Sequence, residues 1–211
     1  AFLLPGQSSR YSGLLSKMIA LSPETRALAA RASERLGFDV LEHFDQGTEQ
    51  AFARNVDVQV GVFLANHMWL RTMEARGVTA ELSAGLSLGE WNHLVHIGAV
   101  SFDDALLAVQ ARGEAYDQGP RGFMASIQPV DLEELREVVD AVQNAQVGLV
   151  EIVNLNSPRQ HVVAGDQAAV EEVMRRVEDE LFGQPVVIER QVPMHAASFS
   201  PVGERVRRVL E

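Results

Sequence analysis

The stretch Gly85-Leu86-Ser87-Leu88-Gly89 places a serine between two glycines, each two positions away. It follows a short apolar patch, Leu82 to Ala84, and precedes a helical pattern over 90–97. A serine on a tight strand-to-helix turn exposes its hydroxyl, and only glycine lets neighbouring backbone come so close. The amides after the serine open the helix and point at a developing oxyanion. The pattern indicates a nucleophile elbow, although a glycine-rich turn with a non-catalytic serine would show the same sequence pattern.

Composition limits what else the chain can be. Its 211 residues are 46% hydrophobic and 22% charged, typical of one globular domain or of one domain with a small insertion. Without cysteine it has no disulfide, thiolate metal site or cysteine nucleophile, which is consistent with a cytoplasmic location. It has no apolar run of bilayer length and no basic N-terminal region typical of a signal peptide. A net charge of −11 without a lysine or arginine block gives nucleic-acid binding little support, and neither a nucleic acid nor a membrane is an expected partner.

The first part of the chain reads as a short strand and several helices. The strand, 2–4, is closed by Pro5-Gly6, and a second strand leads toward Ser83. Helical patterns cover 14–19, 23–36, 58–76 and 103–116, the last with Ser101 as its N-cap. The helix over 58–76 is expected to bury a stripe at spacings of three and four, namely Val58, Val62, Ala65, Trp69 and Met73.

After Gly119-Pro120-Arg121-Gly122 the predicted elements are, in order, a strand, a helix, two strands, a helix and a strand. The expected strands are 123–128, 147–153, 161–164 and 185–191, and the expected helices are 131–142 and 168–181. This βαββαβ order is the split βαβ of a ferredoxin-like module. We therefore predict an α/β fold. A large α/β-hydrolase-like subdomain with a parallel-rich sheet, residues 1–121 and 193–211, carries an inserted ferredoxin-like subdomain, residues 122–192.

A nucleophilic serine needs a base, and the chain offers six histidines: His43, His67, His93, His96, His161 and His195. His67 falls in a helical core pattern, and His43 lies in a loop rich in charge. His93 and His96 point along the helix after the elbow, and His161 lies within a strand of the insertion. His195 follows Val192-Pro193-Met194, where the chain returns to the large part, so it can overhang a cleft from the side opposite the serine. It is the preferred base.

Arg112 shares a helical stripe with Ala105, Val109 and Tyr116, at i, i+4, i+7 and i+11. Because this stripe is otherwise apolar, the arginine either extends to the surface or has a partner inside. A guanidinium in a cleft suits a carboxylate, which it binds with two parallel hydrogen bonds. A structural salt bridge to one of the chain's many acids is the alternative.

Five motifs in order along the chain carry a resemblance to a known family. They are Phe2-Leu3-Leu4-Pro5-Gly6-Gln7, Gly85-Leu86-Ser87-Leu88-Gly89-Glu90, Arg112-Gly113, Asn154-Leu155-Asn156-Ser157-Pro158-Arg159-Gln160 and Pro193-Met194-His195. Together they resemble the malonyl-CoA:acyl carrier protein transacylases and the acyltransferase domains of polyketide synthases. The motifs span nearly the whole chain and are far more specific than the elbow alone.

The resemblance implies a role for each motif. Ser87 would be the nucleophile and His195 its base, and the backbone amides of Gln7 and Leu88 would form the oxyanion hole. Arg112 would bind the free carboxylate of a malonyl-type group. Asn154, Asn156 and Gln160, in a loop of the insertion, would line the cleft, or would only shape a polar turn.

The sequence departs from the family in three places. Leu86 stands where the family usually has a histidine, so that hydrogen bond is absent. Met194 stands where an aromatic residue usually precedes the catalytic histidine, and this flexible side chain could reshape the acyl pocket. The family also continues well past this histidine, and a backbone carbonyl from that stretch orients it. The resemblance thus implies that the C-terminal part of the family fold is missing from a chain that stops at Glu211.

The predicted function is transfer of a malonyl-type acyl group from CoA to the phosphopantetheine thiol of an acyl carrier protein, in fatty acid or polyketide synthesis. No metal and no tightly bound cofactor is implied, and malonyl-CoA is the substrate. The carrier protein would dock on a local basic patch, with Arg121, Arg159 and Arg190 as candidates, and the chain could stand alone or belong to a larger synthase. The alternatives are an acyl-thioester hydrolase using the same pair and a non-catalytic scaffold.

Overall fold

The computed structural model describes residues 1–45 and 48–210, and the chain divides into two compact units. The first comprises Ala1–Asp117 with the residues from Arg208 onward, and the second comprises Gln118–Arg207. Glu211, where the predicted large subdomain ends, lies outside the described residues. No described helix combines the length and apolar character that crossing a bilayer requires.

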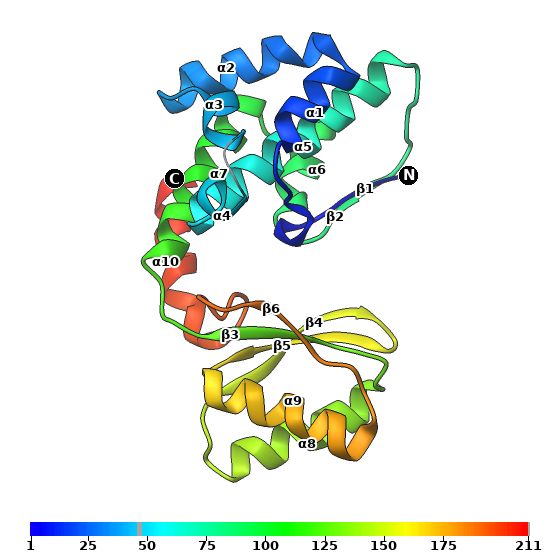
Figure 1. The fold of residues 1–211 in the computed structure, drawn as a ribbon, viewed down its shortest axis with the longest axis vertical. Coiled ribbons are helices and arrows are strands. Elements are labelled where there is room, and N and C mark those ends of the chain that lie inside the picture. The colour runs from blue at the N-terminus through cyan, green and yellow to red at the C-terminus, as the bar shows by residue number, and fades with distance from the viewer. Residues whose placement is uncertain (46–47, 211) are drawn as a thin grey trace. The chain divides into compact units, whose positions relative to one another are not determined.

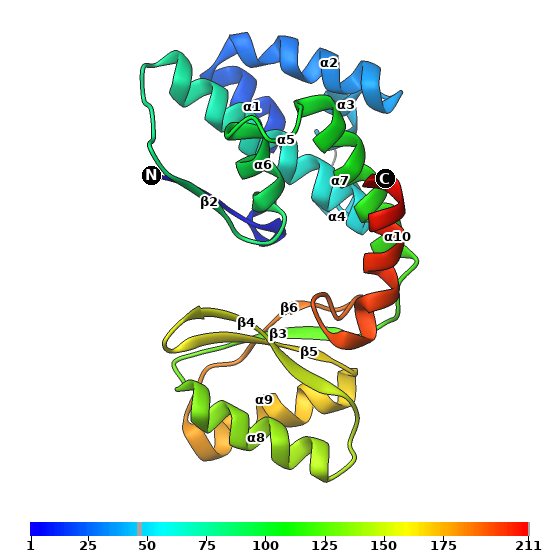
Figure 2. The same ribbon diagram turned by 180° about the vertical axis from the view of Figure 1, so that it is seen from behind.

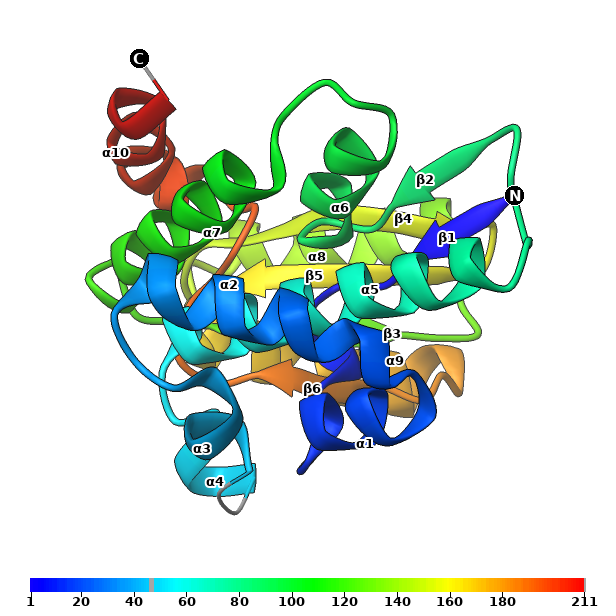
Figure 3. The same ribbon diagram turned by 90° about the horizontal axis from the view of Figure 1, so that it is seen from above.

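The first unit is helical with a small parallel sheet (Figures 1 and 3). Its two strands, β1 and β2, pair in parallel and place Leu4 opposite Gly85. The predicted parallel-rich sheet is represented among the described residues by this pair. The elements of this unit are β1 (Phe2–Leu4), η1 (Gln7–Ser9), α1 (Leu14–Leu21), η2 (Pro23–Thr25), α2 (Arg26–Leu36), α3 (Val40–Phe44), α4 (Thr48–Ala51), α5 (Asn55–Ala75), β2 (Ser83–Gly85), α6 (Gly89–His96) and α7 (Phe102–Asp117).

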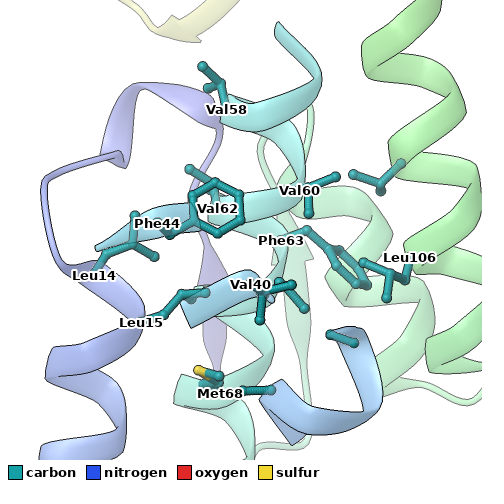
Figure 4. Packing of buried hydrophobic residues seen from close by; sticks show 14 of the residues in the cluster. Leu14, Leu15, Val40, Phe44, Val58, Val60, Val62, Phe63, Met68 and Leu106 are labelled. Carbon is teal, nitrogen blue, oxygen red and sulfur yellow. The ribbon is translucent and has the colours of Figure 1, made fainter. Parts of the chain in front are cut away.

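Helix α5 is the centre of this unit, and α1, α6 and α7 pack around it (Figure 3). Figure 4 shows part of the core, in which Val60 and Phe63 of α5 meet Leu106 of α7, and Leu14 and Leu15 of α1 lie on another side. The predicted buried stripe on α5 is confirmed at Val58 and Val62 and is wrong at Trp69. Trp69, a member of that stripe, is 38% exposed, whereas Gln59, outside it, is fully buried. A helix enclosed on several sides buries more than one face.

The start of α5 depends on an interaction with the end of α7. The carboxylate of Asp117 accepts hydrogen bonds from the backbone N–H groups of Asn55, at 2.7 Å, and Val56, at 3.2 Å. These donors have no partner within the helix, and an acid there also complements the helix dipole. Helix α5 therefore begins three residues before the predicted position, because its cap is distant in sequence.

The second unit is a four-stranded antiparallel sheet in the order β4-β5-β3-β6, with α8 and α9 on one face (Figures 1 and 2). Its apolar core lies between that face and the two helices. The predicted order of strands and helices is confirmed. The elements are β3 (Phe123–Ile127), α8 (Leu132–Asn144), β4 (Val150–Ser157), β5 (Gln160–Gly165), α9 (Gln167–Leu181), β6 (Val186–Glu189), η3 (Ala197–Phe199) and α10 (Ser200–Leu210).

Two details of the second unit differ from the sequence prediction. Strand β4 covers Val150–Ser157 rather than 147–153, because Asp166 accepts a hydrogen bond from the Leu149 N–H just before the strand begins. The unit also extends past the predicted boundary at residue 192. A Cβ on Gly122 would lie 2.8 Å from the Pro193 ring, and a Cβ on Gly119 would lie 2.6 Å from the Phe199 ring. The segment after β6, up to Arg207, therefore belongs to this unit.

Gly113 of the Arg112-Gly113 pair sets how closely α7 approaches α5. A Cβ at this position would lie 2.4 Å from the Cα of Val56. We expect Gly113→Ala to lower the free energy of unfolding by about 1–3 kcal/mol, because the two helix backbones must separate. Urea denaturation measures the change.

The matched control is Gly203→Ala in α10, where no described atom beyond the neighbouring residues and the local helix backbone lies within 4 Å of the added Cβ. This substitution should raise stability by about 0.5–1 kcal/mol through helix propensity alone. If both substitutions changed stability alike, the close helix approach would not be the reason for glycine at position 113.

Candidate active site

Ser87 lies on a tight turn between β2 and α6, as predicted for the elbow. Its φ is 50°, in the left-handed region that residues other than glycine seldom adopt. A Cβ on Gly85 would lie 2.1 Å from the carbonyl carbon of Gly89, so any side chain at 85 would prevent this turn. Helix α6 begins at Gly89, with Leu88 as its N-cap. The two glycines of the motif therefore have the steric role that the sequence indicated.

The elbow packs directly on the end of β1. The Leu86 N–H donates to the Leu4 carbonyl at 3.0 Å, and a Cβ on Gly89 would lie 2.1 Å from that same oxygen. On the other side, a Cβ on Gly6 would be 3.0 Å from the Leu86 carbonyl oxygen. The Pro5-Gly6 turn and the Gln7 that follows it are thus held beside the serine turn within one unit.

Arg112 is buried in α7 among neutral partners. Its Nη1 donates to the Gln59 Oε1 at 2.6 Å, and its guanidinium lies 4.5 Å from the centre of the Tyr116 ring. Burial lowers the pKa of Arg112, while Tyr116 and the charge of Glu90 act in the opposite direction. Burial also raises the pKa of Tyr116. No ion pair among the described residues includes Arg112, so the alternative of a structural salt bridge is not found there.

Gln59, the hydrogen-bond partner of Arg112, was missed by the sequence analysis. It is fully buried in α5, and its Nε2 has no hydrogen-bond partner among the described residues. An amide N–H group left without an acceptor in the interior costs about 1–3 kcal/mol. An anion held by Arg112 would offer such an acceptor. The signal available in the sequence was one glutamine within the apolar run of α5.

His195 lies in the second unit, in a turn that begins at Pro193. The Ala196 N–H donates to the Pro193 carbonyl at 3.2 Å, and His195 has a φ of 68° with an exposed side chain. Met194, which precedes it, is 5% exposed. The local backbone therefore directs the methionine inward and leaves the imidazole at the surface of its unit.

The predicted polar loop in the second unit is mostly strand. Asn154 and Asn156 belong to β4, and Gln160 begins β5, so only Pro158 and Arg159 form the turn between them. The pairing of β4 with β5 is irregular between Ile152 and Asn154 and again between Leu155 and Ser157, which accommodates these polar residues in a strand. Asn156 is exposed, and the Gln160 Nε2 donates to the Gln128 Oε1 at 2.9 Å.

A comparison with known families matches residues 1–211 to the acyl transferase domain. This chain belongs to that family. The malonyl CoA-acyl carrier protein transacylase of Bacillus subtilis (strain 168) is 30% identical over 214 residues, covering 100% of this chain and 67% of the relative. The chain thus spans about two thirds of that relative's length.

Solved structures agree with this assignment. The malonyl CoA-acyl carrier protein transacylase of Coxiella burnetii superposes with a TM-score of 0.91 at 26% identity, covering 99% of this chain and 67% of that one. A malonyl-transacylase in complex with a type II PKS acyl-carrier protein gives a TM-score of 0.89 at 30% identity, covering 99% and 68%.

The remaining histidines of this acyl transferase domain have structural surroundings. His43 lies in α3 rather than in a loop, and its Nε2 is 3.1 Å from Asp57. His93 contacts the Ser83 hydroxyl at 2.8 Å, and His96 lies 3.5 Å from Glu74. His161 is buried, as predicted for a structural residue. Among the described residues, no three histidine, aspartate or glutamate side chains lie close enough together to hold a metal ion.

The three arginines considered for carrier-protein docking all lie in the second unit of the acyl transferase domain. Arg121 is exposed. Arg159 donates to the Pro129 carbonyl at 3.1 Å and lies 3.5 Å from Asp131, while Arg190 lies over the Phe123 ring at 5.5 Å. Arg159 and Arg190 therefore already have intramolecular contacts.

A pair of buried asparagines supports the turn before Gln7. The Asn66 Nδ2 donates to the Pro5 carbonyl at 3.0 Å and to the Asn92 Oδ1 at 3.1 Å, and the Asn92 Nδ2 donates to the Phe63 carbonyl at 2.9 Å. Both side chains are at least 95% buried. This chain of amides connects α6, α5 and the end of β1, and it was not recognised in the sequence because each asparagine falls inside a helical pattern.

We expect Asn66→Leu to lower the free energy of unfolding by about 1–3 kcal/mol, since the Pro5 carbonyl loses its buried donor and Asn92 its partner. The double variant with Asn92→Leu should cost less than the sum of the two single variants, because neither amide is then left unpaired. Urea denaturation of the four proteins gives the coupling energy. Strictly additive losses would mean that the two asparagines act independently.

Proposed function

We propose that this acyl transferase domain moves a malonyl-type acyl group from a CoA thioester to the phosphopantetheine thiol of an acyl carrier protein, through a seryl-enzyme intermediate. The observation that carries the proposal is a buried arginine with neutral partners, in the same unit as a serine on a strained elbow turn. A buried guanidinium that forms no ion pair among the described residues is suited to a substrate with a free carboxylate. The relatives' names include malonyl transfer and, in one solved complex, an acyl-carrier protein.

In the first half-reaction, the Ser87 Oγ attacks the thioester carbonyl carbon and the His195 imidazole accepts its proton. The backbone N–H groups of Gln7 and Leu88 donate to the oxyanion of the tetrahedral intermediate. The intermediate collapses, the carbon–sulfur bond breaks, and His195 returns the proton to the departing CoA thiol. The malonyl group remains on Ser87 as an ester.

In the second half-reaction the roles are reversed. His195 takes the proton of the phosphopantetheine thiol, and the thiolate attacks the ester carbonyl. The bond to the Ser87 Oγ breaks, and the serine regains its proton from His195. Arg112 holds the malonyl carboxylate throughout, and Met194, Asn156 and Gln160 contact the acyl or pantetheine part.

The proposal also covers the finer points of the fold. We assign an α/β-hydrolase-like character to the elbow-bearing part and a ferredoxin-like character to the inserted part, supported by the βαββαβ order and the sheet order β4-β5-β3-β6. Catalysis proceeds without a tightly bound cofactor. A cytoplasmic location belongs to the same proposal and is consistent with the cysteine-free composition.

Ser87→Ala should abolish the covalent malonyl-enzyme adduct, because Ser87 carries the one side-chain hydroxyl in the Gly85–Gly89 sequence. Intact-mass spectrometry after incubation with malonyl-CoA measures the adduct. Ser83→Ala on the adjacent strand is the matched control and should retain it. Detection of the full adduct on the Ser87→Ala protein would refute the nucleophile assignment.

Arg112→Ala should slow malonyl transfer by the equivalent of about 2–5 kcal/mol while affecting acetyl transfer far less, since only malonyl carries the free carboxylate. Single-turnover loading from the two CoA thioesters measures both rates. Because Arg112 is buried, Arg112→Met is tested in parallel to keep the aliphatic packing. Equal losses for the two acyl groups in a folded Met variant would show that Arg112 does not bind the carboxylate.

A further inference from the structure

His195 lies on a segment that connects the two edges of the sheet in the second unit. The sheet order is β4-β5-β3-β6, and the chain leaves β6 at Glu189. Eight residues later, the Ala197 N–H donates at 2.5 Å to the carboxylate of Glu151, which lies on β4 at the opposite edge. Three strand spacings measure about 14 Å, whereas eight residues can extend to about 26 Å. The segment is therefore not taut, and its path depends on its attachments.

The part of this segment next to β6 has several attachments. The Glu189 Oε1 accepts hydrogen bonds from the backbone N–H groups of Arg190, at 2.9 Å, and Gln191, at 2.8 Å. The Gln191 carbonyl accepts from the Gly122 N–H at 3.1 Å, and a Cβ on Gly122 would lie 2.8 Å from the Pro193 ring. These contacts fix the chain as far as Pro193, two residues before the histidine.

His195 itself is the exposed point of the segment. Met194 and Ala196 on either side of it are 5% and 6% exposed, and its own φ is 68°. A residue other than glycine keeps a left-handed conformation only where its surroundings hold the backbone in place. On the far side of the turn, η3 begins at Ala197 without a cap from the side chain before it. Glu151 supplies the acceptor that this end of the turn needs.

The carboxylate of Glu151 is well placed for this role. Its neighbours Val150 and Ile152 belong to the core against α8 and α9, and successive side chains of a strand point to opposite faces. Glu151 therefore projects from the face that these helices do not cover. No ion pair among the described residues includes it, so its charge is not shared with a cation there. An ionised acceptor also makes a stronger hydrogen bond than a neutral one.

We propose that Glu151 is a positioning residue for acyl transfer. By holding the Ala197 N–H, it fixes the turn that carries His195 and with it the orientation of the imidazole. It contacts no reacting group and acts through the backbone. The inference rests on the proposed function, in which His195 is the general base.

Glu151→Ala should lower the rate of acyl-enzyme formation at saturating malonyl-CoA by about 10–100-fold, because the imidazole is less often oriented for proton transfer. The KM for malonyl-CoA should not change, and loading from acetyl-CoA should fall equally, since the base serves both acyl groups. Glu151→Gln should restore the rate to within about threefold of the wild type, because its amide oxygen still accepts a hydrogen bond. Single-turnover and steady-state kinetics measure these values.

Two further measurements separate positioning from a general loss of stability. In NMR spectra of the Glu151→Ala protein, the Ala197 amide should exchange at least about tenfold faster, and the backbone shifts of His195 should no longer indicate a positive φ. Glu151→Gln should preserve both signals. In a His195→Ala background, adding Glu151→Ala should cause no further loss of the residual rate, because Glu151 acts through this histidine.

The matched control is Asp39→Ala in the first unit. Its carboxylate also accepts from backbone N–H groups, those of Leu41 at 2.9 Å and Glu42 at 3.1 Å, and its removal should leave the transfer rate unchanged. A folded Glu151→Ala protein with the wild-type rate or unchanged NMR signals, or a further loss in the His195→Ala background, would overturn the positioning role alone. A wild-type protein that forms no acyl-enzyme would overturn the proposed function, and this role with it.

Discussion

The close approach of two backbone segments, the end of β1 and the start of α6, is the constraint on which the elbow depends. Gly89 lies against the Leu4 carbonyl with no room for a Cβ, and Leu86 donates to that same carbonyl. Ser87 adopts its left-handed conformation between these contacts. Such a conformation costs about 1–3 kcal/mol and persists only where the contacts around it hold the backbone in place. Here a strand pair, two glycines and a buried amide chain provide that support.

A second close approach positions the arginine. Gly113 lets α7 meet α5 at Val56, and Gln59 lies one helical turn further along α5. Arg112, next to Gly113, therefore meets the Gln59 amide rather than a carboxylate. Asp117, at the end of α7, also caps the start of α5. The position of Arg112 and the start of α5 therefore both depend on the packing of these two helices. The Arg112-Gly113 pair is thus a packing motif as well as a chemical one.

Much of this could be predicted from sequence, because glycine spacing and apolar periodicity are local signals. The elbow, the βαββαβ order and the burial of the Arg112 stripe all follow from residues a few positions apart. The errors arise where burial, strand pairing or a hydrogen bond depends on segments that are distant in sequence. Trp69 is 38% exposed although it falls in the predicted stripe, and Asn156 lies in a strand because β5 pairs with the residues on either side of it, Leu155 and Ser157. Gln59 was missed because its partner is 53 residues away.

The buried polar atoms without partners do not all mean the same thing. His161 on β5 lacks partners for both ring nitrogens among the described residues, yet it lies in a sheet interior beside Ile127 and Leu155. It only reduces stability, by roughly the 1–3 kcal/mol that an unpaired buried group costs. Gln59 adjoins the buried guanidinium of Arg112, which has no ion pair among the described residues, whereas the arginines near His67, whose Nδ1 also lacks a partner there, are paired with Asp103 and Glu74. An unpaired donor therefore points to a ligand only where a cation beside it would also stabilise the acceptor that is missing.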